Sequence, residues 1–543
     1  MTWLQNYNPL NSLSLSILFA LLPLIGLLYF LVIRKMKGLY ACAISLLIAT
    51  TLALFIWKMP PLLTFAAITN GMAFGLFPIG WIILHAMWFY NMNVESGQFD
   101  YIRNFLSGLT ADRRLQAVLI AFVLGAFLEG VAGFGTPVAI SGAILISLGF
   151  KPITAATVAL ISNTAPVAFG GLGLTSTVAA QVTGSDVFAI GRASGLAVSL
   201  LGTITPFVIS VVLAGFKKSW EIAPVLFGVG LFYATIQFLI ATFVNPYLPM
   251  FLAAAITLLS FGTFLKYWHP KEIFRFPYDE QIAELPSANP KLLLRAAVPF
   301  ALLTVIIFFW ADLQYSGFKK ILLAWEQQLI SPEFIWPGLH EKVLRTPPAV
   351  PEIIPYPARF IANFISTPGT AILLTGLVSM FLMPGYSVKK AFQCYKKTIF
   401  QLRFALGTLP LVLALAYLMN YSGMSITIGL AFNAVGSFFP FFSPMIGYIG
   451  VFLTGSETSS NALFGVLQQT NANNLGFSTP QMLANNMVGG GTAKMITPQT
   501  ISVATAATNL GGQEGKILEQ TLKISLLYLL FVSLWAGLIA YLS

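Results

Sequence analysis

Two glutamates lie in apolar, glycine-rich stretches of the sequence, where a charged side chain is costly. Glu129 belongs to "FLEGVAGFGTP" (residues 127–137) and Glu457 belongs to "GSETSSN" (residues 455–461). A carboxylate at the centre of a membrane costs about 2.5–3.5 kcal/mol on insertion scales, so it tends to be protonated when buried and ionised when hydrated. Both glutamates are therefore candidate proton carriers. The competing interpretation for each is a carboxylate that pairs with a buried cation or sits at a hydrated turn.

Glycines and neutral polar side chains accompany both glutamates. Glycine permits tight turns and a close approach of the main chain to a ligand. Asn, Ser and Thr add hydrogen-bond partners without charge, although each can equally cap backbone groups freed by a broken helix. The candidate substrate-binding residues of this kind are Gly130, Gly133, Gly135, Ser162, Asn163, Thr164, Ser459, Ser460, Asn461, Asn485 and Asn486.

Lys494 is the cation best placed to bind an anionic ligand. The stretch "GGGTAKMITP" puts it after three glycines and before a Thr-Pro break. We expect it where a broken helix opens, and there it would hold a substrate carboxylate or pair with Glu457. The competing interpretation is a lysine that extends to the membrane interface.

The composition indicates a membrane protein. Of 543 residues, 57% are hydrophobic and 9% are charged, whereas a soluble domain carries roughly 25% charged residues. Apolar stretches long enough to cross the bilayer recur along the chain, which predicts an all-α polytopic protein. The net charge of +11 comes from Lys and Arg beside these stretches, as the positive-inside rule requires, and does not indicate nucleic acid.

The sequence offers no enzyme chemistry. Three histidines and two cysteines are scattered, so no metal site and no cofactor is expected. No nucleophile and base fall at a useful spacing for covalent catalysis. Rings of basic residues, which an anion channel would need, are also absent from the pattern.

The arrangement of the chain across the bilayer follows from hydropathy and the positions of the basic residues. The N-terminus is expected outside, and a basic cytoplasmic loop is expected at 384–403. The predicted spans are 14–33, 37–57, 68–91, 188–214, 220–243, 246–265, 293–312, 366–383, 399–421 and 517–541.

Two regions do not fit as ordinary spans. The apolar stretch 115–128 has 14 residues, about 21 Å of helix, which is too short to cross. A hairpin over 115–150, entered from the cytoplasm, accounts for it, and a second hairpin over 441–474 is expected from the outside. Each is followed by a hydrophobic segment interrupted by glycines, at 152–184 and 479–510.

The two halves of the chain therefore predict inverted repeats. Residues 1–214 form the first repeat, 215–292 form linking spans and a cytoplasmic loop, and 293–543 form the second repeat with an outer loop at 313–365. Paired hairpins and broken helices are typical of secondary transporters whose site lies at mid-membrane.

Four motifs carry a resemblance to a known family. The strings "FLEGVAGFGTPVAI", "ISNTAPVAFGGLG", "LTGSETSSNALFGVLQQT" and "GGGTAKMITPQTISVA" resemble the bacterial lactate permease family, over nearly the whole chain. The resemblance implies an inner-membrane symporter that moves L-lactate, often D-lactate and glycolate, with protons.

The family is similar to the wider ion-transporter group, which includes dicarboxylate/sodium symporters. That likeness implies two re-entrant hairpins, an elevator mechanism and a homodimer. The group carries Ser-Asn-Thr signatures, which "SNT" at 162–164 matches, whereas the second half reads "SET" at 456–458. An acidic residue at that position argues against sodium and for protons.

The function expected from the sequence is therefore proton symport of a 2-hydroxymonocarboxylate in the lipid bilayer. The alternative is a sodium-coupled di- or tricarboxylate symporter, which would need more than one cation where the sequence offers Lys494. The sequence leaves open the preferred substrate, the proton stoichiometry and which glutamate carries the proton.

Overall fold

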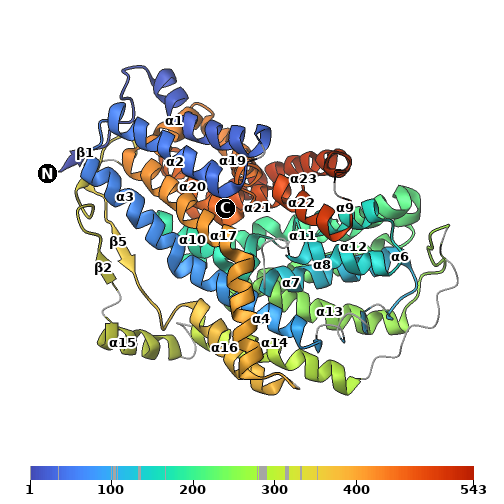
Figure 1. The fold of residues 1–543 in the computed structure, drawn as a ribbon. Helices are drawn as coiled ribbons and strands as arrows, with labels where there is room; N and C mark the ends of the chain where they lie inside the picture. The colour runs from blue at the N-terminus through green and yellow to red at the C-terminus, as the bar shows by residue number, and fades with distance from the viewer. Residues whose placement is uncertain are drawn as a thin grey trace.

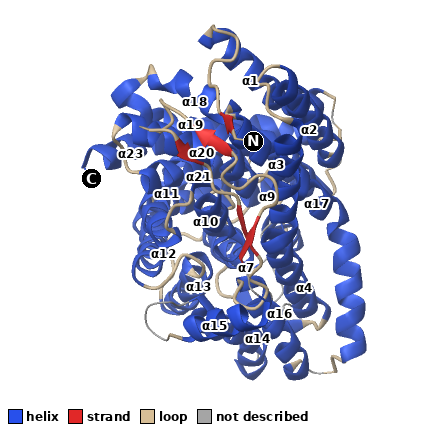
Figure 2. Ribbon diagram, turned by 90° about the vertical axis from the view of Figure 1, so that its left-hand side faces the viewer, coloured by secondary structure: helices blue, strands red, loops and turns tan. Residues whose placement is uncertain are grey.

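The computed structural model is an assembly of packed helices with a small β-structured cap (Figures 1 and 2). It describes residues 1–543 except 1, 35, 99–100, 102–104, 107, 132–135, 166, 278, 280–289, 312–316, 331–332, 351, 384, 511 and 543. Within these described residues, ten helices are long and apolar enough to cross a membrane. This agrees with the polytopic α-helical class expected from composition.

The first helices match the first predicted spans and extend the third. They are α1 (Leu13–Leu28), which continues as η1 (Tyr29–Ile33), α2 (Gly38–Phe55), α3 (Pro61–Phe74), η2 (Gly75–Gly80) and α4 (Trp81–Glu95). The span predicted at 68–91 is thus part of a longer path from 61 to 95. It bends at Phe77, whose backbone is extended (φ −140°, ψ 130°), because Pro78 cannot continue the hydrogen bonding of the preceding turn.

A helical hairpin follows. Its first arm runs through α6 (Arg113–Ala117), η3 (Val118–Leu124) and α7 (Gly125–Val131), and its second arm is α8 (Thr136–Ser147). Ser141 Oγ donates to Ile120 O (3.3 Å), and Arg113 Nη1 donates to Leu148 O (2.7 Å). The start of the first arm and the end of the second arm therefore lie side by side.

The first arm is longer than the sequence suggested. The expectation that this segment is too short to cross was wrong, because the helix begins at Arg113, has 19 residues and is long and apolar enough to span a membrane. Arg113, Arg114 and Gln116 are buried, and their polar atoms bond other protein groups instead of water. Hydropathy cannot recognise such residues as part of a buried helix.

The chain then leaves helical geometry between α9 (Pro152–Ser162) and the regular part of α10 (Gly170–Thr183). Gly171, Leu172 and Gly173 lie in the left-handed region, with φ values of 57°, 56° and 70°. Glycine adopts this region readily, whereas leucine does so only under strain. Three helices follow: α11 (Val187–Trp220), α12 (Ala223–Phe243) and α13 (Pro249–Tyr267).

The second half contains a corresponding series. Its helices are α14 (Pro290–Ala311), α16 (Pro368–Leu382), α17 (Val388–Ser422), α18 (Met424–Asn433), α19 (Phe439–Thr454), α20 (Glu457–Leu475), α21 (Thr479–Lys494), α22 (Pro498–Ala507) and α23 (Glu514–Leu542). Helices α19 and α20 form a second hairpin around Gly455 (φ 71°), and Ser443 Oγ donates to Gln468 Oε1 between its arms (2.8 Å).

The basic loop expected at 384–403 is mostly helix. Helix α17 begins at Val388, because this segment is amphipathic and has a partner. Ala391 and Cys394 are buried beside Trp88, whose Nε1 donates to Ala391 O (3.1 Å). The lysines lie on the exposed side of the helix. The cluster of basic residues therefore marks an exposed helical face, and the prediction of a loop from charge was wrong.

The outer loop 313–365 folds into a cap that includes the N-terminus. It contains α15 (Phe318–Ile330) and four short strands, β2 (Glu333–Ile335), β3 (Val343–Arg345), β4 (Ile354–Pro355) and β5 (Arg359–Ile361). β3 lies between β1 (Trp3–Leu4), to which it is parallel, and β4, to which it is antiparallel, while β2 pairs with β5.

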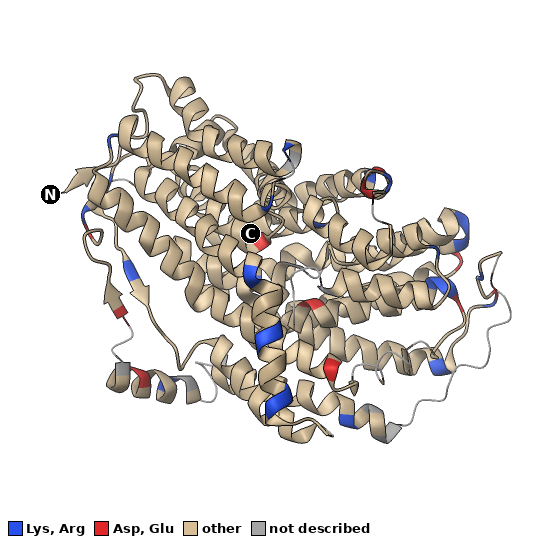
Figure 3. Cartoon of the chain, in the orientation of Figure 1, with Lys and Arg blue, Asp and Glu red and all other residues tan. Residues whose placement is uncertain are grey.

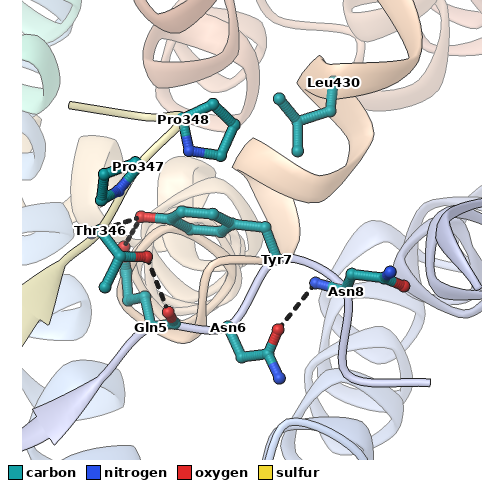
Figure 4. A pocket seen from close by; sticks show the side chains of 8 residues that line it. All are labelled: Gln5, Asn6, Tyr7, Asn8, Thr346, Pro347, Pro348 and Leu430. Carbon is teal, nitrogen blue, oxygen red and sulfur yellow. Dashed lines mark hydrogen bonds between the residues drawn. The ribbon is translucent and has the colours of Figure 1, made fainter. Parts of the chain in front are cut away.

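The N-terminal segment joins this cap to the second half. Gln5 Nε2 donates to the carbonyls of Asn420 and Tyr421 at the end of α17 (2.9 and 2.8 Å). Tyr7 OH donates to Gln5 Oε1 (2.8 Å), and Thr346 Oγ1 donates to Gln5 O (3.0 Å). Gln5, Tyr7 and Thr346 are among the residues that line a cavity of about 250 Å³ (Figure 4).

Lys and Arg lie at the end of the molecule opposite the cap, with Asp and Glu among them (Figure 3). Buried ion pairs join the segments at this end. The Arg113 guanidinium bonds both carboxylate oxygens of Asp279 (2.9 and 2.7 Å). Arg114 pairs with Asp112 (2.7 Å) and donates to the carbonyls of Lys218 and Glu272. These bonds attach the first hairpin to the end of α11 and to the loop after α13.

The Arg113–Asp279 pair predicts a pH-dependent stability. Hydrogen bonds from Arg113 hold the pKa of Asp279 below its usual value, so the pair stabilises the fold above the unfolded-state pKa of about 4. This contribution is lost as pH falls through the lower folded-state pKa. We expect Asp279→Asn to lower the free energy of unfolding at pH 7 by about 2 kcal/mol, between the values for exposed and buried pairs.

Thermal unfolding in detergent, followed by tryptophan fluorescence from pH 7 to pH 3, measures this effect. The difference between the wild type and Asp279→Asn should shrink at the acidic end. Glu333→Gln is the matched control, because its pair with Arg359 is about half exposed. An equal loss of stability at all pH values would contradict the prediction.

Candidate functional site

The two glutamates and Lys494 lie in one buried region where both halves of the chain meet. Glu129 is in the last turn of α7, Glu457 is the first residue of α20 and Lys494 is the last residue of α21. Their side chains are buried, with exposed fractions of 3%, 3% and 7%. The stretch 163–164, just after α9, completes the region.

Glycines allow these elements to approach closely. A Cβ on Gly491 would lie 2.9 Å from Thr164 O and 3.2 Å from Glu457 Oε1. A Cβ on Gly170 would lie 3.1 Å from Glu129 Oε1. Both spacings are tighter than ordinary carbon contacts, so any larger residue would push a glutamate or a broken segment out of place.

Glycines 489–491 stay helical, contrary to our expectation that the glycine cluster would break the helix. Gly489 packs on the backbone of Pro444 and Gly490 packs against Val451. Their lack of a side chain serves helix-to-helix contact rather than a turn. The break comes instead at 495–497, between α21 and α22.

Lys494 is held at the ends of two helices. Its Nζ donates to Gly455 O (2.8 Å), just after α19. The C-terminal end of a helix carries a partial negative charge that stabilises a cation. Lys494 also interacts electrostatically with both Glu129 and Glu457, so it does not extend to a membrane interface.

Several polar atoms of this region have no hydrogen-bond partner in the described part of the chain. They are Glu129 Oε2, both carboxylate oxygens of Glu457, both amide atoms of Asn163 and Thr164 Oγ1. Asn163 lies beside Glu129, but no hydrogen bond of normal geometry joins them. A buried polar atom without a partner costs about 1–3 kcal/mol, so the concentration of such atoms indicates a ligand-binding site.

Other predicted site residues belong to a structural amide network. Asn486 Nδ2 donates to Asn461 Oδ1 (2.9 Å), and Gln468 Nε2 donates to Asn486 Oδ1 (3.1 Å). Asn461 Nδ2 donates to Thr175 O in α10 (3.0 Å), and Ser460 Oγ donates to Gly447 O (3.4 Å). The network joins the second hairpin to α21 and to α10, and its groups are largely occupied.

Four further predicted substrate-binding residues have no side-chain atom among the unpartnered groups of the site. Ser162 Oγ donates to Val158 O within its own helix (2.7 Å). Asn485 Oδ1 accepts from Gln481 Nε2 (2.9 Å) and lies about 100° around α21 from Asn486. Ser459 is buried in the first turn of α20. Gly130 packs on α13, since its Cβ would lie 3.0 Å from Phe251 Cα.

Gly133 and Gly135 lie outside the described residues. Sequence reasoning missed Gln468, Ser443 and the close-packing role of Gly170. A glutamine inside the apolar stretch "ALFGVLQQT" was an available signal, because polar residues in membrane helices usually face a partner. No group of three potential metal ligands was found among the described residues.

The amide network predicts a difference between two adjacent asparagines. Asn486→Ala removes the donor to Asn461 Oδ1 and the acceptor for Gln468 Nε2. It should therefore lower the free energy of unfolding by about 2 kcal/mol. Asn485→Ala is the matched control on the same helix and should cost about half as much or less. Chemical denaturation in detergent measures both, and equal effects would refute a specific role for the network.

Comparison with known proteins gives a consistent family. The model of the L-lactate permease family matches residues 16–543. The glycolate permease GlcA of Escherichia coli K12 is 40% identical over 553 residues, covering 99% of this chain and 98% of that protein. The L-lactate permease of the same strain is 39% identical over 545 residues, with coverage of 99% and 98%.

The L-lactate permease of Bacillus subtilis 168 is also 39% identical, over 556 residues, covering 98% of this chain and 97% of that protein. Among solved structures, Neisseria gonorrhoeae MtrF aligns over 88% of this chain and 83% of its own, with a TM-score of 0.44 and 13% identity. The close relatives are bacterial permeases, and ten described helices are long and apolar enough to span a membrane. The protein is a multi-pass protein of the bacterial inner membrane, and it belongs to the L-lactate permease family.

Proposed function

We propose that the protein imports L-lactate and related 2-hydroxymonocarboxylates, D-lactate and glycolate, by proton symport. The observation that carries the proposal is a pair of buried carboxylates, Glu129 and Glu457, beside the buried Lys494. Glu129 Oε2 and both oxygens of Glu457 have no hydrogen-bond partner in the described part of the chain. The names of the relatives, L-lactate permease and glycolate permease, support this class of substrate.

Charge balance favours a monocarboxylate with a proton. Moving one unit charge against the membrane potential costs about 2.3 kcal/mol per 100 mV. A lactate anion accompanied by one proton is neutral and avoids this cost. Inside the site, the ammonium group of Lys494 compensates the substrate carboxylate while Glu129 or Glu457 takes up the proton.

The polar groups of the site divide naturally between the parts of the substrate. Lys494 has three donor hydrogens, and one of them bonds Gly455 O. The substrate carboxylate binds at Lys494, and its 2-hydroxyl group bonds the amide of Asn163 or the hydroxyl of Thr164. Both of these side chains are buried and have no hydrogen-bond partner among the described residues.

The transport movement belongs to the same proposal. The hairpins α6–α8 and α19–α20 are re-entrant, the two repeats 1–214 and 293–543 are inverted, and the protein works as an elevator-type homodimer. The alternative is a sodium-coupled di- or tricarboxylate symporter. A second substrate carboxylate would need another buried cation, whereas Lys494 is the one cation that the described site contains.

Symport is tested in proteoliposomes that enclose a pH-sensitive dye. Adding L-lactate outside, without sodium, should acidify the lumen faster than in empty liposomes. Glu129→Gln and Glu457→Gln identify the proton carrier, because the variant that lacks it should lose acidification while keeping lactate exchange across the membrane. Lactate uptake that requires sodium and leaves the lumen pH unchanged would overturn the proposal.

The role of Lys494 predicts a loss of substrate binding. Lys494→Gln removes the buried cation, and we expect the apparent affinity for lactate to fall about 100-fold, as for a lost charge-assisted hydrogen bond of about 3 kcal/mol. Lys389→Gln is the control, because that lysine is exposed on α17. Both variants are first checked for a single folded species by size-exclusion chromatography. Unchanged affinity in Lys494→Gln would rule out the proposed anion contact.

A further inference from the structure

Most outward-facing helices expose large apolar side chains, as lipid contact requires. On α23, for example, Leu522, Leu526, Leu530 and Leu534 are between 38% and 52% exposed. The described residues of α8, α9, α10 and α22 expose no large hydrophobic side chain. The exposed surface of these four helices is therefore not suited to contact lipid.

Helix α22 shows this most clearly. Its buried face carries Thr500, Ile501, Ala504 and Thr505. Its exposed positions, continued into the residues that follow the helix, are small or polar: Pro498, Gln499, Ser502, Ala506 and Asn509. A side-chain amide transferred to hydrocarbon without a partner costs several kcal/mol, so this face meets water.

Helix α8 lies beside α22 and extends the same surface. The two helices pack together, and a Cβ on Gly142 would lie 3.3 Å from Thr508 Cγ2. The exposed positions of α8, Ala143 and Ser147, are again small. Arg113 donates to Leu148 O directly after α8, so this surface opens toward the basic end of the molecule, which the positive-inside rule assigns to the cytoplasm.

The corresponding helix of the first half is covered. In α10, Thr175 and Ser176 are buried. Helix α20 lies against it, with Asn461 Nδ2 bonded to Thr175 O and Gln469 Nε2 bonded to Thr183 O (2.8 Å). The structure is thus open along α22 and closed along α10.

The open surface leads to the site. At its inner end, Gln499 is exposed and packs directly on Gly455, the residue whose carbonyl accepts the hydrogen bond from Lys494. Thr500, the next residue, is buried and its Oγ1 donates to Lys494 O. A substrate that leaves Lys494 along this surface meets the Gln499 amide before it reaches water.

We propose that the exposed faces of α22 and α8, with Gln499, Ser502, Asn509 and Ser147, line the aqueous route between the site and the cytoplasm, and that Gln499 is the rim residue at its inner end. The inference rests on the proposed transport of a monocarboxylate. It adds the side to which the site opens and the residues along which the substrate leaves.

Cysteine accessibility tests the route. The protein's own two cysteines, Cys42 and Cys394, are buried, so the wild type serves as the blank. Ser502→Cys and Ser147→Cys are compared with Leu530→Cys on the apolar face and with Ser176→Cys on α10. A membrane-impermeant cationic methanethiosulfonate, which reacts with the thiolate in water, is applied to inside-out and right-side-out vesicles.

We expect Ser502→Cys and Ser147→Cys to react at least about tenfold faster in inside-out vesicles than Leu530→Cys, because thiolates form only where water reaches. Ser176→Cys should react as slowly as the apolar-face control. Equal rates for Ser502→Cys and Leu530→Cys would overturn the route. Faster reaction of Ser502→Cys in right-side-out vesicles would overturn its direction.

Gln499→Cys tests the rim position. Saturating L-lactate should slow its modification several-fold while leaving Ser147→Cys unaffected, because only the inner end lies beside the bound substrate. Equal rates with and without lactate would refute the rim assignment. Lactate exchange is measured in every variant beforehand: if all variants exchange lactate, a failed labelling pattern refutes the route alone, and if the wild type does not exchange lactate, the proposed function itself fails.

Discussion

The burial of Glu129, Glu457 and Lys494 within one region is the constraint on which the site depends. Two acids and one base in a low-dielectric interior cannot all be charged without compensation. The lysine is stabilised by a carbonyl at the end of α19 and by its own position at the end of α21. Among the described residues, Glu129 Oε2 and both oxygens of Glu457 have no partner. They can take up a proton or contact a ligand, as the proposed symport requires.

Close packing by glycine makes this arrangement possible. Gly170 and Gly491 bring backbone against the two glutamates, and Gly489 brings α21 against α19. At these glycines the elements lie so close together that a Cβ atom would come within about 3 Å of a neighbouring atom. Beside this packing, Asn163 lies next to Glu129, and neither its amide atoms nor Thr164 Oγ1 has a hydrogen-bond partner among the described residues.

Around the site, some surfaces are covered by neighbouring elements and others are exposed. The amide network of Asn461, Gln468 and Asn486 binds the second hairpin to α10 and closes that side. The N-terminal segment and the outer loop form a cap that Gln5 attaches to the end of α17. The exposed face of α22 has no such cover among the described residues, and Gln499 and Ser502 lie on it.

The sequence alone was sufficient for the class of protein, most of the helix positions and three charged residues, Glu129, Glu457 and Lys494, that prove to be buried. Hydropathy and charge report transfer from water to lipid, and that energy dominates where a helix faces lipid. They failed where polar residues are paired inside the protein, as with Arg113 and Arg114 in the first hairpin, and where an amphipathic partner surface was needed, as at the start of α17. Only the tertiary structure decided which polar side chains are occupied: Asn163 and Thr164 Oγ1 have no partner among the described residues, whereas Asn461 and Asn486 bond each other, because hydrogen bonding depends on neighbours that are distant along the chain.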